Sequence, residues 1–132
     1  MNGITGTWQM VHTECIDDDG NLLAAPYGPD GTGLLSLNRN GRLICVLCEG
    51  GKEPADGQAR EYNSYCGFYQ FDGKQLITQV DASSNPQWIG SDQIRDVSFE
   101  KDVMILRPVK DSGPVSQGQR VLHWVKLSDH GA

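Results

Sequence analysis

Apolar and polar residues alternate in short runs along most of the chain, which is the pattern of strands that bury one face. About eight such runs can be read, and none of them continues with a helical period. They cover residues 6–15, 34–37, 42–47, 65–71, 75–81, 93–99, 103–107 and 119–127. A short helix over 55–64 also fits the sequence, although Gly57 disfavours it.

Turn residues between these runs predict antiparallel hairpins. Asn40-Gly41 joins two of the runs, and this dipeptide is a strong hairpin signal. Residues 72–74 and 100–102 predict two further hairpins, and the proline- and glycine-rich segment 22–33 predicts an ordered loop.

Hairpins in succession close most simply into a barrel, which removes exposed strand edges. We therefore predict one all-β domain over 1–132, an antiparallel up-and-down β-barrel of about eight strands with at most one short helix. A barrel of that size has an interior just wide enough for one small ligand.

Composition narrows the class of partner. The 132 residues carry a formal net charge of −6, and 38% of them are hydrophobic, which does not fit a disordered chain. The acidic balance argues against nucleic acid and anionic membranes, which attract clustered Lys and Arg. The longest apolar run, 43–48, is too short to span a bilayer. The N-terminus lacks the pattern of a secretory signal, so the predicted location is the cytoplasm.

The four cysteines are predicted to be reduced structural thiols. Cys45 and Cys48 have the C-x-x-C spacing, but they lie in one strand-like run. Residues three apart on a strand point to opposite faces, so these sulfurs do not readily share a metal or a disulfide. The same objection applies to His12 and Cys15 as a metal pair. No metal and no organic cofactor are predicted.

Strict alternation in the first run places Trp8, Met10, His12 and Glu14 on one face. We predict that Trp8 closes one end of the barrel, with an arginine stacked over its ring. The candidates for that arginine are Arg95, Arg107 and Arg120. His12 would then lie further up the interior as a polar contact or a general base, since imidazole titrates near neutral pH. The alternative is an ordinary hydrogen-bonded histidine.

The last run offers a second histidine. In a closed barrel the first and last strands are neighbours, so His12 and His123 could approach each other as an acid–base pair. This requires His123 to face inward, and the alternation leaves open whether His123 or Trp124 does so.

Aromatic side chains and one arginine complete the candidate set. Tyr65 and Tyr69 share a strand face and predict phenols that line a cavity, with packing at the rim as the alternative. We predict that Tyr27 forms a lid at the barrel mouth. Trp88 is predicted to be a second aromatic residue near a barrel end. An inward Arg95 needs either a carboxylate partner or an anionic ligand. The internal ion pair is the favoured interpretation, with Asp81, Glu14 and Asp96 as candidate partners.

The predicted site thus has two groups of residues. The predicted catalytic residues are His12, Tyr65 and His123. The predicted ligand-binding residues are Trp8, Met10, Tyr27, Tyr69, Trp88, Arg95 and Trp124.

Several motifs together resemble the lipocalin-like domain proteins of bacteria and fungi. They are the Gly6-Thr7-Trp8 tripeptide, the loop 26–35, the segment 65–69 and the segment 85–95. The resemblance spans nearly the whole chain and implies a small-molecule cavity inside a barrel. Some barrels of this kind act as cofactor-independent cyclases or isomerases. The chain departs from the family pattern at Thr78-Gln79, where histidine is frequent.

Three functions follow as hypotheses. The first is binding of a small hydrophobic or aromatic metabolite inside the barrel. The alternative is a cofactor-independent isomerase, cyclase or lyase that uses acid–base chemistry in the same cavity. The third is an interaction domain whose interior is filled by its own side chains. The sequence leaves open whether the barrel is a monomer or a homodimer.

Overall fold

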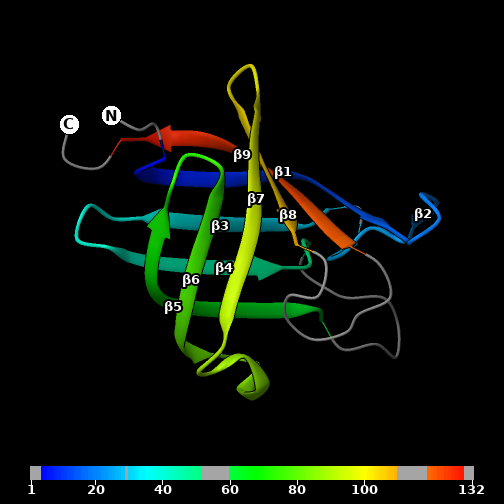
Figure 1. Cartoon of the computed structure of the whole chain (residues 1–132). Coiled ribbons are helices and arrows are strands. Elements are labelled where there is room, and N and C mark those ends of the chain that lie inside the picture. The colour runs from blue at the N-terminus through cyan, green and yellow to red at the C-terminus, as the bar shows by residue number, and fades with distance from the viewer. Residues whose placement is uncertain (1–3, 29, 52–59, 110–118, 130–132) are drawn as a thin grey trace.

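The computed structural model describes residues 4–28, 30–51, 60–109 and 119–129, and these form a closed antiparallel β-barrel (Figure 1). The elements in chain order are β1 (Gly6–Ile16), β2 (Leu22–Leu23), β3 (Thr32–Leu37), β4 (Arg42–Cys48), β5 (Tyr62–Phe71), β6 (Gln75–Ser83), the 3-10 turn η1 (Pro86–Trp88), β7 (Asp92–Glu100), β8 (Val103–Pro108) and β9 (Gln119–Ser128). The predicted all-β barrel is confirmed. The two-residue strand β2, which pairs only with the end of β1, was not predicted.

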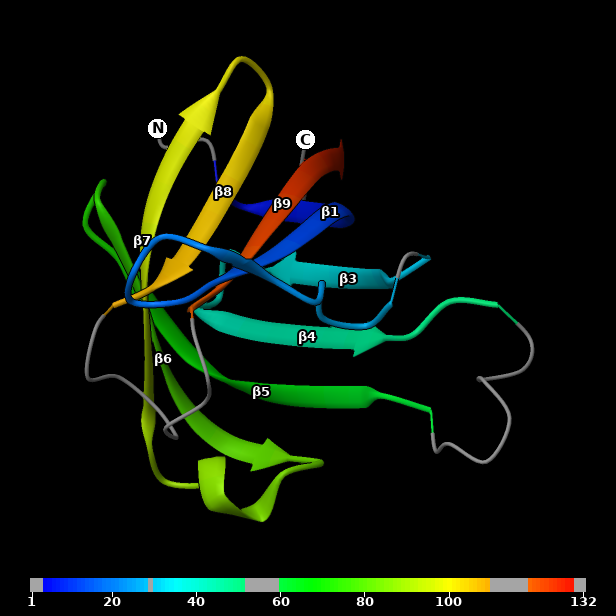
Figure 2. The ribbon, with the colours of Figure 1, turned by 90° about the vertical axis from the view of Figure 1, so that its right-hand side faces the viewer.

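Neighbouring strands follow chain order from β3 to β9, and β1 closes the sheet by pairing with both β3 and β9. In Figures 1 and 2, β1 (blue) lies beside β9 (orange to red). The three predicted hairpins β3–β4, β5–β6 and β7–β8 are all present. At the first of them Gly41 adopts a φ of 87°, a conformation that favours glycine.

The prediction of a helix over 55–64 is wrong for the residues of this segment that the structure describes. Residues 62–64 belong to β5 and pair with β4, while 55–59 lie outside the described residues. The described helical structure is instead the single turn η1, beyond the end of β6 (Figure 2). Among the described residues no helix is long and apolar enough to cross a membrane.

Trp8, which was predicted to close one end of the barrel, is buried in the apolar core near the start of β1. Its ring is 3% exposed, and its Nε1–H donates to the carbonyl of Ile4 at 2.9 Å. The cation over the Trp8 ring is Lys126, whose Nζ lies 5.1 Å from the ring centroid. The prediction of an arginine at this place is therefore wrong. The apolar core extends along the inner faces of most strands. It comprises Ile4, Trp8, Met10, Tyr27, Leu35, Leu37, Leu43, Cys45, Leu47, Leu76, Met104, Leu106 and Trp124.

A bulge in β1 changes which residues face inward. Met10 pairs with Trp124 and His12 with His123, so Val11 is an extra residue between them. Strict alternation resumes after the bulge with the opposite phase, and Thr13 and Cys15 are buried. The predicted interior position of His12 is therefore wrong, because one inserted residue moves each later side chain of the strand to the other face.

Candidate ligand site in the barrel interior

Polar side chains gather on the inner faces of β6 and β7, above the apolar core. Gln93 is 1% exposed and pairs with the buried Thr78, and Arg95 pairs with the core residue Leu76. Arg95 and Gln93 are two residues apart on β7, so both point into the barrel. Arg95 itself is partly exposed.

Arg95 has no carboxylate partner among the described residues. Its guanidinium donates to the carbonyl of Ile94 at 3.0 Å and to Oε1 of Gln93. The three carboxylates that were predicted as partners interact elsewhere, so the predicted internal ion pair is wrong. Asp81 pairs with Arg42 at 2.6 Å, Asp96 accepts from Gln75 at 3.0 Å, and Glu14 lies beside His12 and His123. The other interpretation of Arg95, contact with an anionic ligand, stays a prediction.

Three buried N–H groups among the described residues also lack acceptors. Nε2 of Gln93 and the indole Nε1 atoms of Trp88 and Trp124 are shielded from solvent and have no hydrogen-bond partner in the structure. Nearly all buried polar groups in folded proteins are paired, and an unpaired one destabilises the fold. All three groups are N–H donors. An acceptor oxygen placed beside Gln93 would satisfy its Nε2.

Tyr65 faces inward on β5 and connects Arg95 with the aromatic side chain of Trp88. The rings of Tyr65 and Trp88 meet edge to face, with centroids 5.7 Å apart. A side-chain hydrogen bond joins Tyr65 and Cys45, and Arg95 acts electrostatically on both. Burial raises the pKa of the Tyr65 phenol, with smaller contributions from Cys45. Tyr65 therefore stays protonated at neutral pH and acts as a hydrogen-bond donor.

Tyr27, which was predicted to be a lid, is 2% exposed and belongs to the apolar core. Its backbone N–H donates to Oε1 of Glu61, and its phenol oxygen accepts from Nδ2 of Asn63 at 2.8 Å. The Arg120 guanidinium lies 5.7 Å from the Tyr27 ring centroid. Burial raises the pKa of Tyr27, which also interacts electrostatically with Cys45. The buried ring of this loop residue therefore lies near Cys45 of the interior site.

The other predicted site residues lie apart from this group. Met10 and Trp124 belong to the core, and the phenol of Tyr69 donates to the carbonyl of Asn38 at 2.8 Å, by the β3–β4 turn. The alternation left open whether His123 or Trp124 faces inward on β9. In the structure Trp124 faces inward and His123 outward. His12 and His123 do approach each other, but on the outer face of the barrel.

Sequence reasoning missed Gln93 and Cys45. Gln93 is two residues from Arg95 in the predicted strand, so alternation alone could have placed them on one face. Cys45 pairs directly with Tyr65 across β4 and β5, a register that no pattern within a single strand reveals.

An open hollow of about 350 Å³ lies beside the interior site, along β4, β5 and β6. It is lined by Ile44, Cys45, Ser64, Tyr65, Cys66, Ala82, Ser83 and Ser84. Ile44 is half-exposed on the outer face, whereas Cys45 and Tyr65 belong to the inner face. The hollow is therefore a groove in the barrel wall at the height of Tyr65, and its volume is within the range of small-ligand sites.

The cysteines behave as predicted from their positions on strands. None of the four forms a disulfide; Cys15 and Cys45 are buried, and Cys48 and Cys66 are partly exposed. Burial raises the pKa of Cys45 to about 12, so almost none of it is thiolate at pH 8. We expect native protein at pH 8 to leave Cys45 unmodified by iodoacetamide while Cys66 reacts, as read by peptide mass spectrometry. Equal labelling of the two thiols before denaturation would contradict this placement of Cys45.

Comparison with known proteins agrees with the fold. A family model described as a lipocalin-like domain matches residues 5–127, which is nearly the whole chain. No curated protein and no solved structure gives a significant match. The chain therefore belongs to the lipocalin-like domain family.

Proposed function

We propose that the barrel binds a small, mainly apolar or aromatic molecule that carries an acceptor oxygen, such as a carboxylate or a carbonyl. The oxygen faces Arg95 and the free N–H of Gln93, and the apolar part packs against Tyr65 and Trp88. The observation that carries the proposal is the buried N–H of Gln93 without an acceptor, beside an arginine without a carboxylate partner among the described residues.

The aromatic side chains support an aromatic or flat apolar ligand. Tyr65 and Trp88 present ring surfaces at right angles, an arrangement that can contact a third ring from two sides. Tyr27 adds a buried ring with a raised pKa that also interacts electrostatically with Cys45. Membership of the lipocalin-like family agrees with a ligand inside the barrel.

Acid–base catalysis in the same cavity has less support. Of the three predicted catalytic residues, only Tyr65 faces the interior, because His12 and His123 point outward. Burial raises the pKa of Tyr65, so its phenol can donate a hydrogen bond to a ligand oxygen but cannot serve as a base at neutral pH. Binding is therefore the function that we propose.

A matched pair of probes tests the proposal. 1-Naphthoic acid carries a carboxylate, and 1-naphthalenemethanol has the same rings without the charge. We expect Arg95→Gln to weaken naphthoate binding about ten- to a hundredfold, the size of a lost charge-assisted hydrogen bond. Binding of the neutral alcohol should change much less. Isothermal titration calorimetry on the full chain measures both affinities.

Arg107→Gln is the control, because Arg107 is an exposed arginine on β8 and its loss removes the same charge. We expect it to leave both affinities within about twofold of those of the unmodified protein. Equal naphthoate affinity in Arg95→Gln and the unmodified protein would show that Arg95 does not hold the acceptor group. Failure of both probes to bind at millimolar concentration would count against an aromatic ligand.

A further inference from the structure

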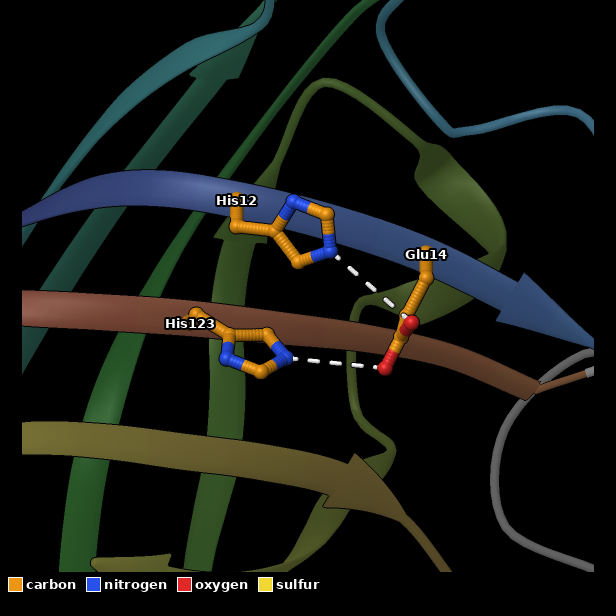
Figure 3. Close-up of side chains that lie close together, drawn as sticks. All are labelled: His12, Glu14 and His123. Carbon is orange, nitrogen blue, oxygen red and sulfur yellow. Dashed lines mark ion pairs between the residues drawn. The ribbon is translucent and has the colours of Figure 1, made fainter. Parts of the chain in front are cut away.

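Two histidines and a glutamate meet on the outer face of the barrel where β1 joins β9. The bulge at Val11 places His12 directly opposite His123, with ring centroids 4.9 Å apart and planes at 76°. Glu14 lies two residues further along β1, on the same face. Its carboxylate is directed towards both imidazoles, with Oε1 3.6 Å from Nε2 of His123 and Oε2 3.8 Å from Nε2 of His12 (Figure 3).

These separations are close to those of ligands around one metal ion. Bonds of about 2.1 Å in a tetrahedral zinc site put neighbouring ligand atoms about 3.4 Å apart. One ligand atom from each of His12, Glu14 and His123 lies within 4.8 Å of the others. The His12 side chain is 58% exposed, so a small rotation can bring its nitrogen closer. Two strands that are hydrogen-bonded to each other hold the three Cα positions in place.

The surroundings of His123 supply a second, independent observation. Its Nε2 atom is shielded from solvent, yet it has no hydrogen-bond partner in the structure. The flanking side chains of Val121 and Ile105 are 0% and 2% exposed, so this part of the site is dry and apolar. An imidazole nitrogen that is shielded from water and directed at a carboxylate is unsatisfied as it stands. A bound cation would satisfy both groups.

We infer that His12, Glu14 and His123 form a binding site for a divalent transition-metal ion such as Zn²⁺ on the outer face of β1 and β9. Imidazole nitrogen and carboxylate oxygen are ordinary ligands of Zn²⁺, and three protein ligands leave a fourth position for water. The net charge of −6 also favours cations over anions. The inference is independent of the interior ligand, which contacts the opposite face of the sheet.

The test uses the full chain after treatment with a chelator. Isothermal titration calorimetry with Zn²⁺ should show one saturable ion per chain. Glu14→Gln and His123→Gln should each weaken binding at least tenfold, because even loss of an outer partner of a metal site weakens binding by about 10–100-fold. Asp96→Asn is the control, since it removes the same charge from an exposed position on β7 and should leave affinity unchanged.

Co²⁺ used in place of Zn²⁺ identifies the ligands directly from spectra of the unmodified protein. This readout therefore keeps the inference testable if a variant is less stable. Bound Co²⁺ should shift and broaden the imidazole NMR signals of His12 and His123 in the unmodified protein, without the intense near-ultraviolet absorption of cobalt–thiolate bonds. Binding that survives in Glu14→Gln and His123→Gln, thiolate absorption, or the absence of saturable Zn²⁺ binding would each overturn the inference.

Discussion

Trp8→Ala should lower the free energy of unfolding by about 3–5 kcal/mol, the usual range for a buried tryptophan. Trp8 is 3% exposed near the start of β1, where its indole donates to the carbonyl of Ile4 and lies under Lys126. Alanine would leave a cavity and an unpaired carbonyl. Because whole domains are stable by only about 5–15 kcal/mol, the variant would be marginal. Urea unfolding followed by circular dichroism measures the loss.

Two further variants separate the contributions of Trp8. Trp8→Phe keeps most of the ring volume and loses the hydrogen bond to Ile4, so it should be more stable than Trp8→Ala. Leu127→Ala, at a position that is 54% exposed, should change stability by no more than about 0.5 kcal/mol. If Trp8→Ala were as mild as Leu127→Ala, Trp8 would not be part of the apolar core that stabilises the barrel.

Gly67→Ala should lower the free energy of unfolding by about 3 kcal/mol, at the upper end of the range for overpacking. Gly67 is buried on the inner face of β5, beside the register shift between β5 and β6. A Cβ at this position would lie 1.9 Å from the carbonyl oxygen of Gln79 and 3.1 Å from the Cα of Val80. Both are backbone atoms, so the two strands would have to separate. Thermal unfolding should show a midpoint roughly 10 °C lower.

Gln70→Ala provides the comparison on the same strand, because Gln70 is exposed on the outer face. We expect its unfolding midpoint to stay within a few degrees of that of the unmodified protein. A Gly67→Ala midpoint as high as that of Gln70→Ala would mean that β5 and β6 adjust without strain.

The strands and hairpins could be predicted from the sequence because their signals are local. The apolar alternation and the Asn40-Gly41 turn lie within single segments, and the structure confirms the hairpins that they indicate. The orientation of His12 could not be predicted in the same way. It depends on the bulge at Val11, which moves the later residues of β1 to the opposite face of the strand. The sequence of β1 alternates on both sides of the bulge, so the pattern does not mark where the bulge lies.

The partners of Arg95 are a second feature that could not be predicted from the sequence. Its inward position follows from alternation, but its partners depend on which residues of other strands lie opposite. Asp81 and Asp96 were reasonable candidates by distance along the chain, yet they interact with Arg42 and Gln75 respectively. Only the register of the closed sheet shows that no described carboxylate reaches the guanidinium.

Closure of the sheet by β1 and β9 has a kinetic consequence. Pairs such as Thr7 with Ser128 and Cys15 with Arg120 join residues more than a hundred positions apart, so the barrel has a high contact order. Such topologies fold slowly, typically in milliseconds to seconds, because the long loop must be closed before its contacts form. During synthesis the barrel cannot close until β9 has left the ribosome, and until then β1 lacks its pairing with β9.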